Sequence, residues 1–206
     1  MSNMMSYQRF FQLFDAFILK LEVGSGLGPL LLRLYLAPVF MQAGYNKFIH
    51  FDSTVQWFGN AEWGLGLIFP ELMVYLAGGA ELIGGFLLLP GLAIRFVVVP
   101  LMVTMVVAIF AVHWENGWLA ISDASSWLAN DRVIAAVNQK QRVIEILKEH
   151  GHYGYLTQNG SITLLNNGIE FAVTYFIMLF SLFFTGAGRF TSIDYFIYRY
   201  FSQKSA

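Results

Sequence analysis

Four long apolar tracts run along the chain, at residues 28–48, 67–89, 95–114 and 169–185. A hydrocarbon core about 30 Å thick needs about 20 helical residues per crossing, so these tracts suit membrane-spanning helices. The second tract has Pro70 near its start and is followed by Pro90-Gly91, which are signals for the start and end of a helix. The pattern predicts an all-α membrane protein built around a four-transmembrane-helix bundle.

An amphipathic segment, residues 1–26, precedes the membrane domain, which we place at residues 27–195. Apolar side chains in this segment recur at helical spacing, with polar side chains on the opposite face. A cleavable signal peptide would need an unbroken apolar run, which Asp15 and Lys20 interrupt. We therefore predict an N-terminal helix that lies in the membrane interface.

A second amphipathic segment follows the last apolar tract. Thr191 or Ser192 can cap a helix there, with Asp194 in its first turn, and tyrosine and phenylalanine fill the rest. This pattern predicts a second interfacial helix. We assign the last residues, 196–206, to a C-terminal cytoplasmic tail.

Residues 115–168 form the only sizeable polar segment and are expected to fold as a small cap. Asn130 or Asp131 can cap a helix whose apolar positions share one side: Val133, Val137, Ile144 and Leu147. Asn159-Gly160 is a strong signal for a two-residue hairpin turn. It predicts two short strands, at residues 153–158 and 161–165, and therefore an αβ cap.

The composition supports membrane residence. Hydrophobic residues make up 57% of the 206 residues and charged residues only 12%, about half the share in soluble domains. This balance excludes an ordinary cytosolic globule, a disordered chain and a nucleic-acid binder. Cysteine is absent, which excludes disulfides, thiol nucleophiles and cysteine-ligated metal centres in this chain.

The distribution of lysine and arginine predicts the orientation. With four crossings both termini share one side, and seven basic residues near the helix ends fall on that side: Arg9, Lys20, Arg33, Arg95, Arg189, Arg199 and Lys204. The opposite side has Lys47 in a short connection. It also has four basic residues in the long loop, where the rule loses force: Arg132, Lys140, Arg142 and Lys148. We predict a bacterial inner-membrane protein with both termini in the cytoplasm and a periplasmic cap.

Ionisable residues inside the membrane are costly, so each should have a partner or a function. Counting residues from the cytoplasmic ends predicts that Arg33 reaches Glu81, either as a buried pair that fixes helix register or as a site where Glu81 handles a proton. A second polar layer is predicted near the outer boundary: Asn46, Lys47, Glu71, His113, Asn166, Asn167 and Glu170. This layer is either a set of solvated helix ends or a binding site at the membrane surface.

Several motifs taken together resemble the DoxX family of small four-helix bacterial membrane proteins. They are Arg33…Phe40…Gly44…Lys47, Gly78-x-x-Glu81-x-x-Gly84-Gly85, Leu89-x-Gly91, His113, Glu170 and Gly186-x-Gly188-Arg189…Ser192-x-Asp194. The resemblance implies a four-helix inner-membrane bundle linked to quinone chemistry. The long cap is similar to that of the HvfX-type branch, whose genes lie beside those for copper-binding modified peptides.

Two functions of different classes follow. The first is a quinone-interacting subunit or accessory of a membrane oxidoreductase, in which electrons pass to or from partner subunits. Its candidate catalytic residues are Glu81, His113, Glu170 and Lys47, and its candidate cofactor-contacting residues are Arg33, Asn46 and Arg95. Here His113 would exchange a proton with a quinone oxygen and Lys47 would stabilise negative charge on it.

The second function is non-enzymatic handling of copper or a copper-chelating peptide. Its candidate metal ligands are His113, His150 and His152, together with methionines in the helices. A third reading makes the chain an anchor for a periplasmic protein that docks on Trp118 and Trp127 of the cap. The lipid bilayer is the expected surrounding in every case, and a homo-oligomer is left open.

Overall fold

The structure of the protein is a computed structural model, and it describes residues 24–204. The predicted N-terminal interfacial helix therefore lies almost wholly outside the described residues. The described residues divide into two compact units, of which one comprises residues 24–102 and 178–204 and the other is Val103–Ile177. Within the described range the chain is helical and has no strand, only one isolated bridge.

Helices occupy the apolar tracts where the sequence predicts them. The first two are α2 (Leu27–Ile49) and α4 (Pro70–Leu88), and Pro70 lies in the first turn of α4, where a missing N–H costs nothing. The third tract forms α5 (Ile94–Val107), which continues through a π-helical turn, Ala108–His113, and a 3₁₀ turn, Trp114–Asn116. The fourth tract forms α8 (Glu170–Thr185).

Three of these apolar helices are long enough to cross a membrane: Leu27–Ile49, Pro70–Leu88 and Ile94–Asn116, counted among residues 24–204. The fourth, α8, is apolar but has only 16 residues, or about 24 Å of helix. Three membrane-spanning helices are therefore supported by length and composition, and the fourth crossing stays a prediction. The unit that contains α2 and α4 has two shorter helices, α3 (Phe51–Gly59) and α9 (Ile193–Lys204). The sequence pattern did not predict α3.

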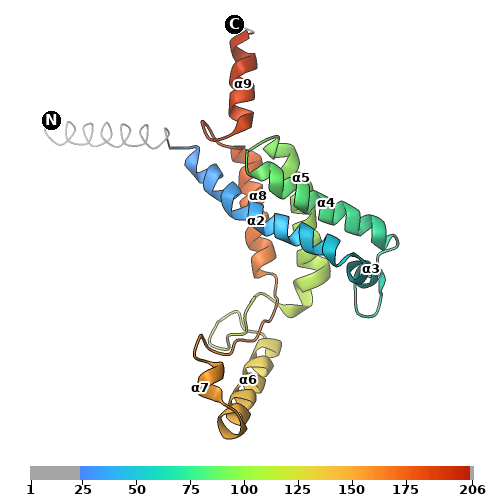
Figure 1. Cartoon of the computed structure of the whole chain (residues 1–206), viewed down its shortest axis with the longest axis vertical. Helices are drawn as coiled ribbons and strands as arrows, with labels where there is room; N and C mark the ends of the chain where they lie inside the picture. The colour runs from blue at the N-terminus through green and yellow to red at the C-terminus, as the bar shows by residue number, and fades with distance from the viewer. Residues whose placement is uncertain (1–23, 205–206) are drawn as a thin grey trace, which may run out of the picture. The chain divides into compact units, whose positions relative to one another are not determined.

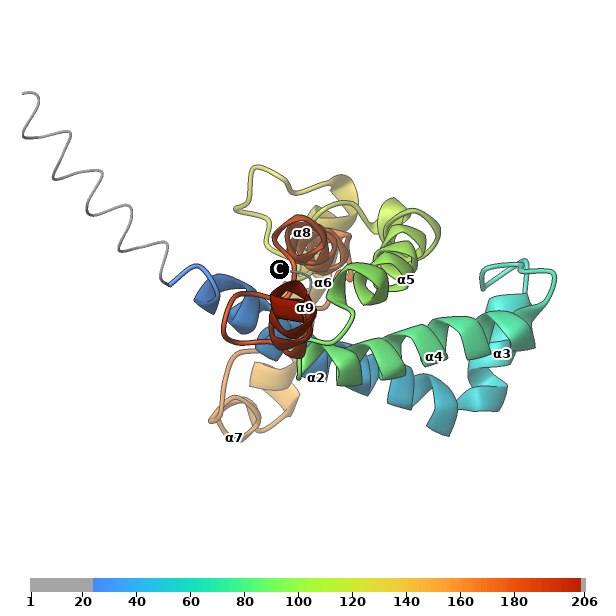
Figure 2. The ribbon, with the colours of Figure 1, turned by 90° about the horizontal axis from the view of Figure 1, so that it is seen from above.

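Glycine brings α2 and α4 close together, and Figures 1 and 2 show the two helices lying side by side. A methyl group added at Gly44 would come within 2.5 Å of the Leu82 backbone nitrogen of α4. One added at Gly85 would come within 2.8 Å of the Met41 backbone nitrogen of α2. The small residues of the predicted stripes thus face each other, which is typical of helix packing in membranes.

The cap has a helix where one was predicted but no hairpin. Helix α6 (Asp131–His150) begins at Asn130, whose side chain accepts a hydrogen bond from the backbone N–H of Val133. The hairpin prediction is wrong because Tyr153–Leu156 forms the short helix α7. Leu165 instead forms an isolated bridge with Ile121. The Asn159-Gly160 signal describes only the local turn. The second predicted strand pairs instead with a segment distant in the sequence, at Ile121.

Candidate functional site

The candidate site is an ion pair between α2 and α4. The Nζ atom of Lys47 lies 2.5 Å from Oε2 of Glu81. Glu81 is 3% exposed, whereas the Lys47 side chain is 24% exposed. Both residues belong to helices long and apolar enough to span a membrane. The α2–α4 ion pair therefore holds a carboxylate out of solvent and leaves its ammonium partner partly accessible.

Gly78 allows this pair to form. A methyl group added to Gly78 would lie 3.1 Å from the Phe48 ring and 3.5 Å from Cβ of Lys47. Glu81 is about one helical turn beyond Gly78, on the face of α4 that packs against α2. The close packing that glycine permits places the two charges within hydrogen-bond distance and removes water from around Glu81.

The predicted pairing of Arg33 with Glu81 is not formed. Arg33 is fully buried, and its guanidinium donates to the backbone carbonyls of Leu88 and Leu89, each at 3.3 Å, and of Thr191 at 2.7 Å. The last carbonyls of α4 lack partners within their own helix, so Arg33 caps the end of α4. The C-terminal end of α4 is thus level with Arg33, and Glu81, seven residues before Leu88, lies about 10 Å deeper along the helix.

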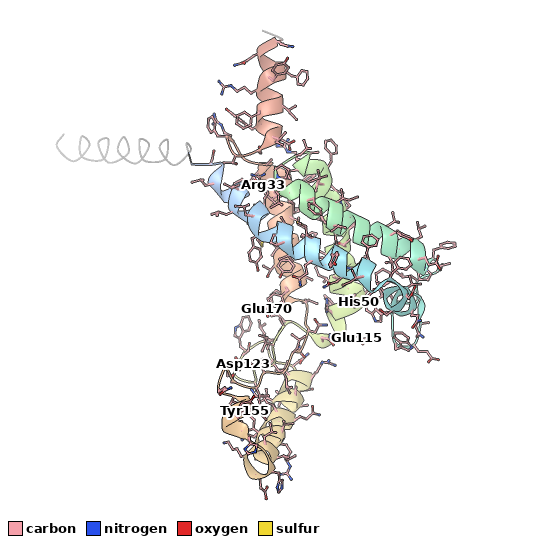
Figure 3. The ribbon with its side chains drawn as sticks, in the orientation of Figure 1. Arg33, His50, Glu115, Asp123, Tyr155 and Glu170 are labelled. Carbon is pink, nitrogen blue, oxygen red and sulfur yellow. The ribbon has the colours of Figure 1, made fainter. Side chains whose placement is uncertain are left out.

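Asp194 completes a group of contacts around Arg33 that we call the helix-end cluster (Arg33, Gly91, Thr191 and Asp194). The Asp194 carboxylate accepts hydrogen bonds from the backbone N–H groups of Ala93 at 2.6 Å and Ile94 at 3.0 Å, at the start of α5. Its own N–H donates to the Gly91 carbonyl at 3.1 Å. Figure 3 labels Arg33 at this end of α2. The cluster joins the start of α2, the end of α4, the start of α5 and the segment before α9.

His113 ends the π-helical turn in the second unit. Its Nδ1 lies 2.9 Å from the backbone carbonyl of Asn167, which also accepts from the Asn116 side chain at 3.0 Å. A carbonyl only accepts, so this hydrogen bond places the proton on Nδ1 and leaves the Nε2 lone pair for another partner. Asn167 has φ of 59°, in the left-handed region. Backbone of this kind and π-helical turns both occur often at functional sites.

Glu170, at the start of α8, supports the cap backbone. Its Oε2 accepts a hydrogen bond from the backbone N–H of Ala120 at 2.9 Å, and Figure 3 labels it where α8 begins. The neighbouring Asn166 is 2% exposed, and its amide nitrogen donates to the carbonyls of Asn116 and Leu119. These contacts indicate a positioning role for Glu170 and leave a catalytic role as a prediction.

The remaining candidate residues, all within the described range, make no hydrogen bond or ion pair with Lys47 or Glu81. Arg95 donates to the Phe184 carbonyl at 3.4 Å, and Asn46 is exposed. His150 and His152 are exposed on the cap. No three His, Asp or Glu side chains among the described residues lie close enough to hold a metal ion, so copper binding stays a prediction of the sequence.

Sequence reasoning missed the roles of Asp194 and Gly91. The sequence predicted Gly91 as part of a helix-end signal and Asp194 as an acidic residue in the first turn of the last helix, but not their contacts with α4, α5 and Arg33. Asp194 could have been found as a capping residue, because aspartate is favoured beside free helix N–H groups. Its target, however, is the start of α5, about a hundred residues earlier in the chain, and that contact depends on the tertiary fold.

Apolar helices of spanning length and a buried ion pair between them define a multi-pass membrane protein. Residues 28–114 match the model of the DoxX family. The resemblance to the DoxX family drawn from the motifs is therefore confirmed over this segment, which is less than half of the chain. The matched range contains Arg33, Lys47, Glu81 and His113, whereas Glu170 and α9 lie outside it.

Two curated relatives agree with this assignment. The chain is 40% identical over 86 residues to "Putative oxidoreductase CatD" of Bacillus subtilis, which is 42% of this chain and 60% of that protein. It is 31% identical over 100 residues to an "Uncharacterized protein" of Haemophilus influenzae, which is 47% of this chain and 64% of that one. The chain thus spans less than two thirds of each relative. No solved structure gives a significant match.

Proposed function

We propose that the protein is a quinone-interacting, redox-associated subunit of a membrane oxidoreductase system, and that its α2–α4 ion pair exchanges a proton with the quinone. The observation that carries the proposal is the buried Glu81 carboxylate held by Lys47 inside the segment that matches the DoxX family. An ionisable pair at membrane depth is costly and marks proton or ligand pathways. The oxidoreductase name of the Bacillus relative supports the redox class.

The chemistry assigns one task to each side chain. Reduction of a quinone to a quinol takes up two electrons and two protons, and the electrons come from a redox centre in a partner subunit. Lys47, the more exposed member of the pair, donates a hydrogen bond to the quinone oxygen that gains negative charge. Glu81, a carboxylate in the pair, takes up a proton from water and passes it to that oxygen, which returns Glu81 to the carboxylate. The second proton of the quinol comes from water, and the catalytic role of His113 stays a prediction of the sequence.

Replacement of Lys47 by methionine is expected to weaken quinone binding about tenfold, because a charge-assisted hydrogen bond contributes about 1.5 kcal/mol or more. The measurement is titration of the protein in lipid nanodiscs with a short-chain ubiquinone, followed by tryptophan fluorescence. Lys148→Met, which removes an exposed lysine of α6, is the matched control and is expected to bind as the unaltered protein does. Equal affinity of Lys47→Met and the unaltered chain would contradict the proposal.

We also propose four crossings in a bacterial inner membrane, with both termini in the cytoplasm. The excess of basic residues on one side supports this orientation. The helix-end cluster supports it too, because the start of α2 and the segment between α8 and α9 meet there: Thr191 Oγ1 lies 3.2 Å from the Gly26 carbonyl.

Single cysteines test this orientation cleanly because the chain contains none. Ser161→Cys in the cap is expected to react with a membrane-impermeant maleimide in intact spheroplasts. Ser202→Cys in α9 is expected to react only after the cells are lysed. Both positions are exposed, so reaction of both from the same side would contradict the four-crossing arrangement.

A further inference from the structure

A hollow of about 390 Å³ lies in the cap, within the second unit. One face of α6 forms its first wall, with side chains spaced at i, i+3, i+4 and i+7: Arg132, Ala135, Ala136 and Gln139. The two alanines leave room between the long polar side chains at either end. The volume lies in the range of pockets that bind small ligands, about 300–1,000 Å³.

Arg132 is exposed, and one hydrogen bond restrains its guanidinium while most of its donors stay available. Its Nε donates to Oδ1 of Asn166 at 3.3 Å. Asn166 is fixed in turn, since its amide nitrogen donates to two backbone carbonyls of the cap, at 2.8 and 2.6 Å. No hydrogen bond or ion pair joins the terminal nitrogens of Arg132 to another described residue. The planar end of the guanidinium is thus oriented and available for a bidentate contact.

The hollow is also lined by Ser122, which has a buried hydroxyl. Ser122 is 6% exposed, and its Oγ makes no hydrogen bond among the described residues. An unpaired buried hydroxyl is unfavourable, so this group favours a ligand that can accept a hydrogen bond from it. Leu164 and Leu165 line the same hollow and give it an apolar side.

We propose that this hollow binds a ligand with a carboxylate at one end and a short apolar body, a site independent of the quinone proposal. Arg132 binds the carboxylate through its two terminal nitrogens, at the positive N-terminal end of α6. Ser122 donates to the same end, the apolar body covers Ala135 and Ala136, and Gln139 contacts the far end. A single guanidinium beside an apolar wall matches a carboxylate better than a phosphate, which proteins bind with several cationic or backbone N–H groups.

The length of the site limits the length of the ligand that it can bind. Arg132 and Gln139 are seven residues apart on α6, which corresponds to about 10 Å along the helix axis. Three residues of extended peptide span a similar distance, at about 3.3 Å per residue. The carboxylate can therefore belong to a peptide C-terminus or to a free medium-chain acid, and the two sources share the chemistry that Arg132 recognises.

The test is calorimetric titration of the full chain in nanodiscs with two pairs of probes. The first pair is the tripeptide Ala-Ala-Val and its C-terminal amide, and the second is hexanoate and hexanamide. We expect at least one acid to bind about ten- to a hundredfold more tightly than its amide, because the amide loses a charge-assisted pair. Binding of only the tripeptide acid assigns the ligand to peptide termini, and binding of only hexanoate assigns it to free acids.

Variants confirm the position of the site. Arg132→Gln is expected to abolish the preference for acid over amide, whereas Arg142→Gln, on an exposed arginine of the same helix, is expected to keep it. Ala136→Leu fills the hollow without changing charge and is expected to weaken both acids. Failure of both acids to bind, equal binding of acid and amide, or an unchanged preference in Arg132→Gln would overturn the proposal.

Discussion

Replacement of Lys47 by methionine is expected to lower the free energy of unfolding by about 3–5 kcal/mol, the typical cost of removing one partner of a buried ion pair. The remaining Glu81 is 3% exposed and lies between packed helices, so it must either keep an unpaired charge or take up a proton. Glu81→Gln is expected to lower the free energy of unfolding by less than Lys47→Met does, because the charge that remains is not trapped between the helices. The Lys47 ammonium is partly exposed and can turn toward water on its flexible stem.

A double-mutant cycle separates this pair from general effects of substitution. We expect Lys47→Met combined with Glu81→Leu to recover most of the stability lost by Lys47→Met alone, because the double variant leaves no buried charge. Stability is measured by equilibrium unfolding in mixed detergent, with Lys148→Met as the control on an exposed lysine. The pair would be unimportant to stability if Lys47→Met and Lys148→Met unfolded alike.

The second large effect is expected for Gly91→Ala, which should lower the free energy of unfolding by about 2–4 kcal/mol. Gly91 has φ of 70°, and the left-handed region costs other residues about 1–2 kcal/mol. A methyl group there would also collide with the Arg33 guanidinium and come within 2.7 Å of Cβ of Ser192. If Arg33 moves away, the buried carbonyls at the end of α4 lose their donor, which adds to the cost.

Gly28→Ala is the matched control for this prediction. A methyl group at Gly28, in the first turn of α2, would meet no atom within 4 Å. We expect its effect on stability to stay within about 0.5 kcal/mol. The measurement is equilibrium unfolding of both variants under the same conditions. Equal stability of Gly91→Ala and Gly28→Ala would show that the helix-end cluster is not tightly packed.

The helices were predictable because their signals are local. The first tract was predicted at residues 28–48 and found at Leu27–Ile49, since apolar length and flanking residues together determine such a helix. Helix α3 was missed because nine residues between two longer helices carry only a short amphipathic pattern. The hairpin at Asn159-Gly160 was wrong because its two flanking segments found other structure, one as α7 and the other in the bridge to Ile121.

The candidate site was predictable in its residue types but not in its pairing. Lys47, Glu81 and Arg33 were recognised because ionisable residues in apolar tracts are few. Which of them meet depends on how far each helix extends beyond its neighbour. Counting from the helix ends assumed that α2 and α4 end at one level, but Arg33 meets the last carbonyls of α4, and Lys47 lies nearer to Glu81.

The central proposal is that Glu81 changes its protonation when a quinone is reduced. The most direct test is redox-induced infrared difference spectroscopy of the protein in nanodiscs with bound short-chain ubiquinone, reduced electrochemically. We expect a carboxyl stretching band while the reduction proceeds, which is absent in Glu81→Gln and persists in Glu71→Gln, a change to an exposed glutamate in the first turn of the same helix. A band that persists in Glu81→Gln, or no band when quinone is bound, would contradict the proposal.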